Sequence, residues 1–222
     1  MRVNRFVAAA SGLSRRAADL IVADGRVEID GVVATTGADV ADGAAVKLDG
    51  AILRLPENHL YVLLNKPVGY VCSRARQGAA PTVYELLPAA YAGLKPVGRL
   101  DRDSSGLLLL SDDGDFIYRL THPSRNKAKI YRVKLARPLT AADIRALETG
   151  VLLDDGSSKV KILDQHGREV TVELREGRNR QLRRTFGAID NGIVNLERVI
   201  MGPYRLDNLP VGQWRLVEGT DR

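Results

Sequence analysis

The sequence is poor in the residues that build disulfides and metal sites. It contains one cysteine, three histidines and 5% aromatic residues among 222. The single cysteine, Cys72, excludes a disulfide within this chain, and we expect it to be a small packed residue rather than a nucleophile. His59, His122 and His166 are far apart and lack metal-ligand spacing, so no metal site is predicted.

Long apolar runs are also missing. No stretch approaches the roughly 18 apolar residues that a membrane-spanning helix needs. The first residues, MRVNRFVAAASGLSRRAAD, lack the uninterrupted apolar run of a signal peptide. The sequence therefore predicts a soluble, cytoplasmic protein with no membrane partner.

What the chain has in excess is positive charge. It carries 33 basic and 27 acidic side chains, a formal net charge of +6 and a pI near 9.6. The first fifty residues hold 6 basic and 7 acidic side chains, so the excess lies in the remainder, with 27 basic and 20 acidic. Clustered Lys and Arg displace counterions from phosphate backbones, so the balance favours a polyanionic partner.

Two short helices are predicted at the start of the chain. Apolar residues recur at helical spacing from Val3 to Ala10, and Gly12 ends that segment. Ser14 is placed to cap a second helix, which ends near Gly25. We expect this second helix to carry its apolar face on Ala17, Leu20 and Ile21.

A hairpin completes the first region. The stretch VEIDGVV alternates around Asp30-Gly31, a strong hairpin signal. We predict a helix-helix-hairpin domain over residues 1–52, followed by the connector AILRLPENH.

From residue 60 to 222 the pattern changes to strands and turns. LYVLLN, KIYRVKL and EVTVEL read as strands, and Leu182, Phe186 and Ile189 share one face of a later helix. The sequence predicts an α+β fold, with flanking helices on a mainly antiparallel mixed sheet.

The segment PVGRLDRDSSGLLLLSDDGDF has the most unusual composition. Its alternating charges could form surface ion pairs of little energetic value. Asp101, Asp103, Ser105, Gly106 and Asp112 also match positions 1, 3, 5, 6 and 12 of a calcium loop. The calcium interpretation fails on context, because such a loop needs flanking helices and four leucines fill the span before Asp112.

Taken together with its neighbours, this segment resembles the pseudouridine synthases that modify ribosomal RNA and carry an amino-terminal S4 domain. Four motifs occur in the family's order: LNKPVGYVCS, VGRLDRDSSGLLLLSDDGDF, KIYRVKL and LREGRNRQLRRTFGAI. The SRR and GRVEIDG pattern of the first region is similar to the S4 RNA-binding domain. The chain departs from the family pattern at Leu182 and Thr185.

The resemblance implies roles for three residues. Asp101 would be the catalytic nucleophile, Tyr131 would pack against the target base, and Arg183 would pair with the catalytic carboxylate. Strand alternation alone would make Tyr131 a core residue, and phosphate binding is the alternative for Arg183.

A second set is predicted to contact RNA. Arg15 and Arg16 oppose the macrodipole of the second helix, which invites a functional reason, although two solvated arginines are the alternative. The resemblance implies that Arg99 fills the space that a target base vacates, and an ion pair is the alternative. Five arginines fall within ten residues near the last motif, a density suited to folded RNA. The predicted RNA contacts are Arg15, Arg16, Lys66, Arg99, Arg178, Arg180 and Arg184.

The sequence thus predicts an enzyme that isomerises a specific uridine in ribosomal RNA to pseudouridine, without metal or cofactor. Its expected partner is ribosomal RNA or a ribosomal subunit precursor, and it is expected to act as a monomer. The alternative is a noncatalytic RNA-binding or ribosome-assembly protein with the same surface.

Overall fold

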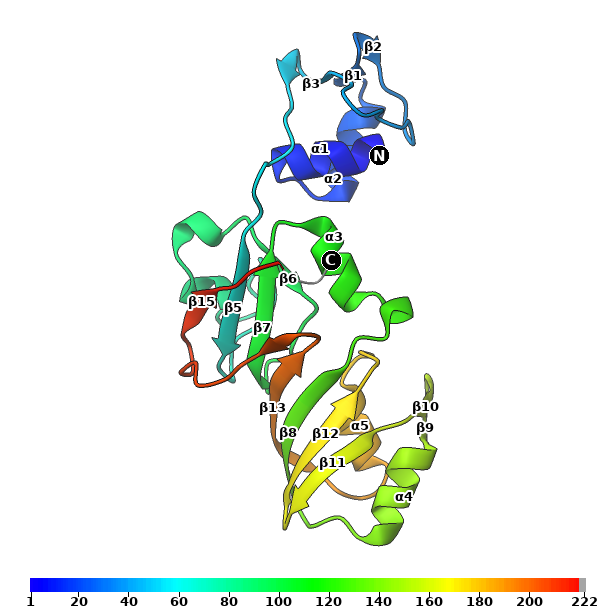
Figure 1. The fold of residues 1–222 in the computed structure, drawn as a ribbon, viewed down its shortest axis with the longest axis vertical. Coiled ribbons are helices and arrows are strands. Elements are labelled where there is room, and N and C mark those ends of the chain that lie inside the picture. Colours follow the sequence, from blue (N-terminus) through cyan, green and yellow to red (C-terminus); the bar gives the residue numbers. More distant parts are fainter. Residues whose placement is uncertain (220–222) are drawn as a thin grey trace. The chain divides into compact units, whose positions relative to one another are not determined.

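The computed structural model describes residues 1–219, and the chain divides into two compact units (Figure 1). The first comprises Met1–Leu60 with Asp112–Gly114. The second comprises Tyr61–Ser111 and the residues from Asp115 onward. Within the described part of the chain, no helix is long and apolar enough to cross a membrane.

The first unit opens with two helices whose ends follow the sequence signals. Helix α1 (Val3–Ser11) ends at Gly12, which has a φ of 74°. Helix α2 (Arg15–Ala23) begins at Ser14, whose side chain accepts a hydrogen bond from the Ala17 amide at 3.1 Å. Two short helices were predicted here, and the structure contains both.

The predicted core face of α2 was wrong at one residue. The buried side chains of α2 are Ala18 and Val22, whereas Leu20 is 68% exposed. Because residues advance by about 100° around a helix, Leu20 lies nearly opposite Ala18. The apolar stripe that packs on α1 therefore uses smaller residues than the sequence pattern suggested.

A four-stranded sheet with order β2-β1-β3-β4 completes the first unit. Strands β1 (Val27–Ile29) and β2 (Val32–Val33) form the expected hairpin through Asp30 and Gly31, both at positive φ. Strand β3 (Val46–Leu48) pairs with β4 (Ala51–Ile52). The segment predicted as a connector from residue 51 therefore begins as a strand of this sheet.

The second unit is built on one large sheet. Its order is β11-β12-β8-β13-β7-β5-β15, with β14 on β13 and β6 on β7. The strands are β5 (Tyr61–Lys66), β6 (Lys95–Val97), β7 (Ser105–Ser111), β8 (Lys129–Leu135), β11 (Lys161–His166), β12 (Glu169–Leu174), β13 (Ile193–Met201), β14 (Tyr204–Arg205) and β15 (Trp214–Leu216). The β7–β13 pair is parallel, and the other strand pairs of this sheet are antiparallel. The α+β prediction with a mainly antiparallel mixed sheet is confirmed.

Strand β7 separates two apolar clusters. Leu108 and Leu110 face the larger cluster, which includes Val133 and Phe186. Leu107 and Leu109 face the other side of the sheet, where Phe116 lies. The four consecutive leucines are all fully buried because this strand is covered on both faces.

Three helices and a hairpin complete the second unit. They are α3 (Gly114–Thr121), α4 (Ala141–Thr149), α5 (Gln181–Gly187), and the hairpin of β9 (Val151–Leu153) with β10 (Gly156–Ser158). Helix α5 buries Leu182 and Phe186 as predicted, whereas Ile189 follows the end of the helix. Short single-turn 3-10 helices occupy Val83–Leu86, Ala89–Tyr91 and Pro123–Arg125.

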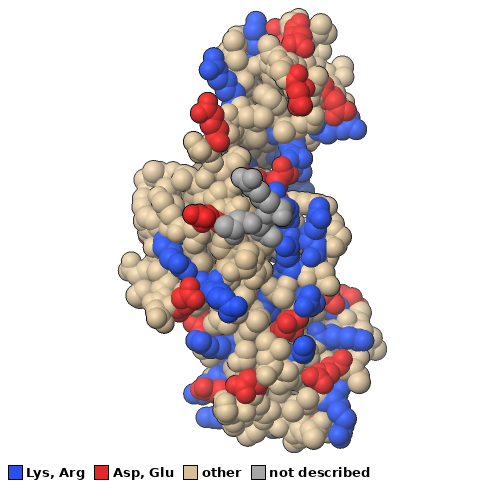
Figure 2. Space-filling view, viewed as in Figure 1, with Lys and Arg blue, Asp and Glu red and all other residues tan. Residues whose placement is uncertain are grey.

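Surface charge does not mark a site by itself. Figure 2 shows Lys and Arg side chains interspersed with Asp and Glu on the face in view. Net charge therefore indicates a class of partner, and the site has to be located from the geometry of individual side chains.

Candidate active site

Asp101 lies in the loop between β6 and β7, and a buried lysine holds that loop. Lys66, the last residue of β5, donates from its ammonium to the carbonyl oxygens of Pro67 at 3.0 Å, Asp101 at 3.1 Å and Ser104 at 2.6 Å. Lys66 is fully buried, and this burial lowers the pKa of its ammonium. Two of the three acceptors belong to the Asp101 loop and the third is Pro67, so the structure gives Lys66 a structural role and lends no support to its predicted contact with RNA.

Cys72 fixes the same loop on its other side. Its sulfur lies 3.4 Å from both the amide and the carbonyl oxygen of Leu100. Burial raises the pKa of the Cys72 thiol, which favours the unreactive protonated form. Cys72 is therefore a packing residue, as expected.

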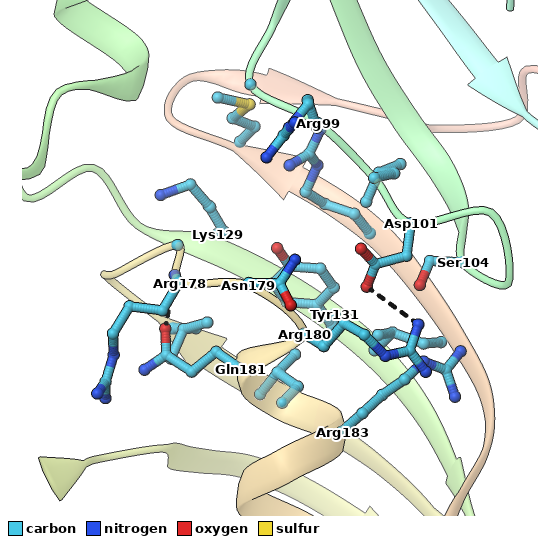
Figure 3. Close-up of a pocket in the computed structure, with 18 of the residues that line it drawn as sticks. Arg99, Asp101, Ser104, Lys129, Tyr131, Arg178, Asn179, Arg180, Gln181 and Arg183 are labelled. Carbon is cyan, nitrogen blue, oxygen red and sulfur yellow. Dashed lines mark hydrogen bonds and ion pairs between the residues drawn. The ribbon is translucent and has the colours of Figure 1, made fainter. Parts of the chain in front are cut away.

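The loop forms one wall of a pocket of about 240 Å³ in the second unit. Arg99, Asp101 and Ser104 line it from the loop, Tyr131 from β8, and Arg180 and Arg183 from the start of α5. In Figure 3 the Asp101 carboxylate and Arg180 point toward each other, with Tyr131 beside them. The structure thus brings together residues from three of the four sequence motifs.

The ion pairs in this pocket differ from those predicted. Arg183 donates to the backbone oxygen of Asp103 at 2.7 Å, and its Nε lies 3.1 Å from the Asp103 carboxylate without pointing its N–H at it. Asp101 is paired instead with Arg180, at 3.8 Å. The predicted Arg183–Asp101 pair is wrong, because Asp103 lies closer to Arg183 in the loop.

Asp103 also accepts the hydrogen bonds of Arg180, so Arg180 is not hydrogen-bonded to Asp101. The two terminal nitrogens of Arg180 donate to the two carboxylate oxygens of Asp103, each at 3.0 Å. These hydrogen bonds, with the nearby charge of Arg183, lower the pKa of the Asp103 carboxyl. Among the described residues, the Asp101 carboxylate accepts no hydrogen bond, so its oxygens remain available to a substrate.

The backbone of Arg180 is held in a costly conformation. It precedes α5 with a φ of 44° and a ψ of 32°, the left-handed region that non-glycine residues rarely occupy. Such a residue costs on the order of 1 kcal/mol and persists where surrounding contacts determine it. The forked contact with Asp103 is one such constraint, and it aims the guanidinium at Asp101.

Tyr131 is both a core residue and a pocket residue. It is 8% exposed and packs in the larger apolar cluster, in agreement with the strand alternation. It also lines the pocket beside Asp101. The two interpretations are therefore compatible, because one face of the ring packs inward and the rest borders the pocket.

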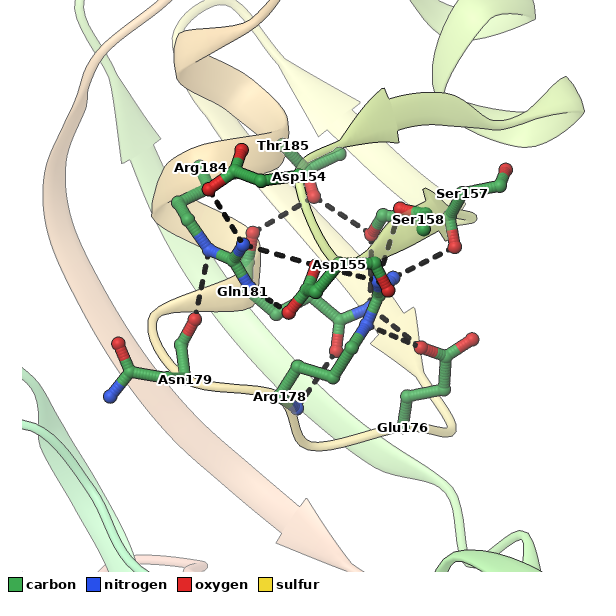
Figure 4. Close-up of polar contacts among 11 residues, drawn as sticks. Asp154, Asp155, Ser157, Ser158, Glu176, Arg178, Asn179, Gln181, Arg184 and Thr185 are labelled. Carbon is green, nitrogen blue, oxygen red and sulfur yellow. Dashed lines mark hydrogen bonds and ion pairs between the residues drawn. The ribbon is translucent and has the colours of Figure 1, made fainter.

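Arg178 and Arg184 belong to a different cluster, shown in Figure 4. Arg178 donates to Asp155 Oδ1 at 2.8 Å, and Arg184 donates to Asp155 Oδ2 at 2.7 Å. Arg178 also donates to the backbone oxygens of Asp155, Gly156 and Ser157. These contacts attach the β9–β10 hairpin to the loop before α5 and to α5 itself, and the predicted contact of the two arginines with RNA remains a prediction.

The departure at Thr185 has a local explanation. Its hydroxyl is fully buried and lies 2.8 Å from both Ser158 Oγ and the Gln181 carbonyl oxygen. The side-chain amide of Gln181 donates from Nε2 to the same Ser158 oxygen at 2.9 Å. A polar residue at position 185 therefore fits because β10 presents a hydroxyl to it.

Three other arginines that were predicted to contact RNA are exposed in the structure. Arg15 and Arg16 are exposed in the first turn of α2, and Arg99 is exposed at the pocket. Within residues 1–219, these three side chains form no hydrogen bond or ion pair. The alternative ion pair of Arg99 is thus absent from the described structure, and its charge faces solvent.

Two further cations line the pocket, Lys129, which the sequence grouped with the basic residues near the last motif, and Arg198, which it did not single out. Lys129 donates to the Glu176 carbonyl oxygen at 3.1 Å, and burial, with the neighbouring charge of Arg198, lowers its pKa. Arg198 is 2% exposed in β13. Strand β13 also contains Asn195 and Glu197, so its sequence did not mark Arg198 as the buried charge.

The described residues contain no group of three or more His, Cys, Asp or Glu side chains that could hold a metal ion. Most of the segment that matched a calcium loop in register is strand β7, Ser105–Ser111, which pairs within the large sheet. What the pocket offers is a carboxylate free to react, an aromatic face and several cations. That arrangement suits covalent or electrostatic work on a planar, polyanionic substrate.

Comparison with known proteins identifies the family. A sequence model described as RNA pseudouridylate synthase matches residues 60–188. The chain is 36% identical to the ribosomal small subunit pseudouridine synthase A of Pasteurella multocida, covering 100% of this chain and 95% of that protein. It is 34% identical to the ribosomal large subunit pseudouridine synthase B of Yersinia pestis, covering 96% of this chain and 71% of that protein.

A solved structure agrees with these relatives. A crystal structure described as pseudouridylate synthase superposes with a TM-score of 0.72 and 32% identity, covering 100% of this chain and 97% of that one. The aligned region extends over both units of this chain. The chain therefore belongs to the RNA pseudouridine synthase family, and it is an isomerase.

Proposed function

We propose that this enzyme converts a specific uridine of ribosomal RNA to pseudouridine, with Asp101 as its nucleophile. The observation that carries the proposal is the Asp101 carboxylate, which borders the pocket beside Tyr131 and accepts no hydrogen bond from the described residues. The relatives named for the small and the large ribosomal subunit support ribosomal RNA as the substrate.

The reaction suits a site with this composition. The N1–C1′ bond of uridine breaks, the uracil turns while it stays bound, and a bond forms between C5 and C1′. A proton leaves C5 and N1 gains one, so the reaction is redox-neutral. A carboxylate assists by adding to C6 of the base or by acting at C1′, which divides one difficult exchange into easier steps.

The neighbours of Asp101 have distinct parts in this proposal. Tyr131 offers its ring to the target uracil, which must not escape during the turn. Arg180 faces Asp101 from 3.8 Å and orients the carboxylate. Arg183 acts one step further away, by holding the Asp103 backbone at 2.7 Å, and is a positioning residue.

The target base has to leave its stack before it reaches the pocket. Extruding a base costs a few kcal/mol, and the cost is lowest in loops and distorted helices of RNA. Arg99 is exposed at the pocket and unpaired, so it is placed to fill the space that the base vacates. Arg15 and Arg16 on the S4-like first unit supply further contacts with phosphate.

The partner in this proposal is ribosomal RNA or a ribosomal subunit precursor, encountered in the cytoplasm. In this proposal the enzyme acts as a monomer.

Mapping of pseudouridines in ribosomal RNA tests the function. RNA from cells that contain the protein and from cells that lack it is treated to reveal every pseudouridine in both subunits. We expect one site to disappear in the deficient cells and to return when purified protein acts on their RNA. An identical map in both strains, with no modification by the purified protein, would contradict the proposal.

A further inference from the structure

Arg198 is a buried cation placed beside the residue that meets the substrate base. In the pairing of β13 with β8, Arg198 lies directly opposite Tyr131. Directly opposed residues on antiparallel strands point to the same face, with their Cβ atoms about 5 Å apart. Both residues line the pocket, so Arg198 borders the same space as the ring proposed to contact the uracil.

The surrounding backbone fixes Arg198 in this position. Gly106 on the parallel neighbour β7 has a φ of 99°, and a Cβ at this glycine would lie 2.3 Å from the Arg198 carbonyl oxygen. After Arg198, the register of β13 against β8 shifts by an irregularity between Arg198 and Ile200. Bulges of this kind redirect side chains and are over-represented next to active sites.

The guanidinium of Arg198 is only partly satisfied by the protein. Its Nε donates to the Leu107 carbonyl oxygen at 2.8 Å. Its Nη2 is buried and, among the described residues, has no hydrogen-bond partner. No carboxylate of the described chain forms an ion pair with it, and its charge contributes to the lowered pKa values of Lys66 and Lys129. An uncompensated buried cation is costly, which indicates that a ligand completes its bonding.

We propose that Arg198 is a catalytic residue that donates a hydrogen bond from its terminal guanidinium nitrogens to a carbonyl oxygen of the target uracil. This inference rests on the proposed function and adds a group that stabilises negative charge on the base. A donor fixed in advance, in a site that excludes water, is an effective way to lower the energy of such a charge.

Both routes to pseudouridine put negative charge on the carbonyl oxygens of the uracil, to which Arg198 can donate a hydrogen bond. If Asp101 assists at C1′, the N1–C1′ bond breaks with its electron pair on N1, and the uracil anion shares this charge with its carbonyl oxygens. If Asp101 adds to C6, the C5–C6 electron pair moves toward the C4 carbonyl oxygen. If Asp101 is attached at C1′, C5 bonds to C1′ as the bond from C1′ to Asp101 breaks, which returns the carboxylate. If Asp101 is attached at C6, C5 bonds to C1′ as the N1–C1′ bond breaks, and the later loss of Asp101 from C6 restores the C5–C6 double bond. In both routes the C5 proton leaves to solvent and N1 gains a proton, so no net charge remains on the base.

The burial of Arg198 indicates that its ligand is the target base and not a backbone phosphate. Arg198 is 2% exposed, so it contacts only a group that enters the pocket. A flipped base enters, whereas the charged phosphates stay at the surface with exposed arginines such as Arg99. The burial of Arg198 therefore favours a role in the chemical step over a role in RNA affinity.

The test measures tritium released from ribosomal RNA transcribed with [5-³H]uridine, for wild-type protein, Arg198→Ala and Arg198→Lys. We expect kcat to fall about 100-fold in Arg198→Ala with KM changed less than about threefold, as for loss of an oxyanion donor. Added guanidinium ion at millimolar concentration should restore at least part of the rate of Arg198→Ala. The matched control, Arg145→Gln, removes an exposed positive charge from α4 and should change neither constant.

Several results would overturn the inference. A raised KM with unchanged kcat in both variants would make Arg198 a phosphate contact. A fall in kcat that follows a loss of melting temperature and is not rescued by guanidinium would make its role structural. If Arg198→Ala does not fold, Arg198→Lys decides, because it retains the charge but loses the Nε donor to Leu107, and we expect kcat to fall about tenfold. No tritium release by the wild-type protein would refute the proposed function itself.

Discussion

Two pairs of arginines from one short segment differ in how fully they occupy the carboxylates beside them. Arg178 and Arg184 share Asp155: Arg178 donates to Oδ1 at 2.8 Å, and Arg184 donates to Oδ1 at 3.1 Å and to Oδ2 at 2.7 Å. Arg180 and Arg183 approach the loop of Asp101, where Asp103 takes the close contacts and Asp101 remains 3.8 Å from Arg180. Both oxygens of Asp155 therefore accept hydrogen bonds from the first pair, whereas the Asp101 carboxylate accepts none from the second.

This difference teaches that arginine density alone does not define an RNA-binding surface. The Asp155 cluster attaches a hairpin to the loop that carries Arg180, so its contribution is to hold the pocket wall (Figure 4). In the proposed mechanism the pocket pair acts on the Asp101 carboxylate and its loop. Changes in the pocket pair should therefore reduce activity, and changes in the Asp155 cluster should reduce stability.

Arg183→Ala should have the largest effect among these arginines. The side chain is 15% exposed and donates to the backbone oxygens of Asp103 and Ile193. Its loss leaves buried acceptors unsatisfied, which costs about 1–3 kcal/mol in stability, and it releases the Asp101 loop. We expect kcat to fall by about 100-fold or more in the tritium-release assay. Activity of Arg183→Ala near the wild-type level would show that Arg183 does not position the loop.

A comparison of Arg180→Ala with Arg180→Gly should separate the effect of the guanidinium on activity from the effect of the backbone conformation on stability. Both variants remove the group that faces Asp101, and we expect kcat to fall by about tenfold in each. Glycine accommodates the φ of 44°, so Arg180→Gly should melt higher than Arg180→Ala. Equal melting temperatures would indicate that the left-handed conformation at position 180 is not strained.

Asp155→Asn should affect stability more than activity. Arg178 and Arg184 would lose their shared charge, and we expect the melting temperature to fall by a few degrees with kcat lowered less than about threefold. The opposite pattern, an unchanged melting temperature with a tenfold lower kcat, would place the Asp155 cluster in the catalytic machinery.

The smallest expected effect is on acid stability. Hydrogen bonds from Arg180 lower the pKa of Asp103, and those from Arg184 lower the pKa of Asp155. A carboxyl with a lowered folded pKa contributes stability above its unfolded pKa of about 3.9, and this is lost as pH falls through the folded value. In urea melts, the stability gap between the wild type and Asp103→Asn should narrow below about pH 4. A constant gap down to pH 3 would contradict this assignment.

Local patterns predicted much of the fold. Alternation identified β8 and β12, the leucine run identified β7, and Ser14 marked the start of α2. These features depend on residues adjacent in sequence, so periodicity and capping rules apply directly. Leu20 was misplaced because a nine-residue helix with several small apolar residues allows more than one buried stripe.

Partner choice at the site could not be predicted in the same way. Arg183 meets Asp103 across 80 residues of sequence, and Arg184 meets Asp155 across 29. Whether Asp101 or Asp103 receives an arginine depends on the path of a short loop that Lys66 holds from β5. Sequence spacing contains no information on such distances, although it did indicate which segments carry the site.

The most direct test of the central claim is Asp101→Asn, which replaces the reacting carboxylate with an amide of the same shape. The account predicts that tritium release from [5-³H]uridine-labelled ribosomal RNA falls to background, while RNA affinity and melting temperature stay near those of the wild type. Pseudouridine formation by Asp101→Asn at a rate close to wild type would contradict the assignment of Asp101 as the nucleophile.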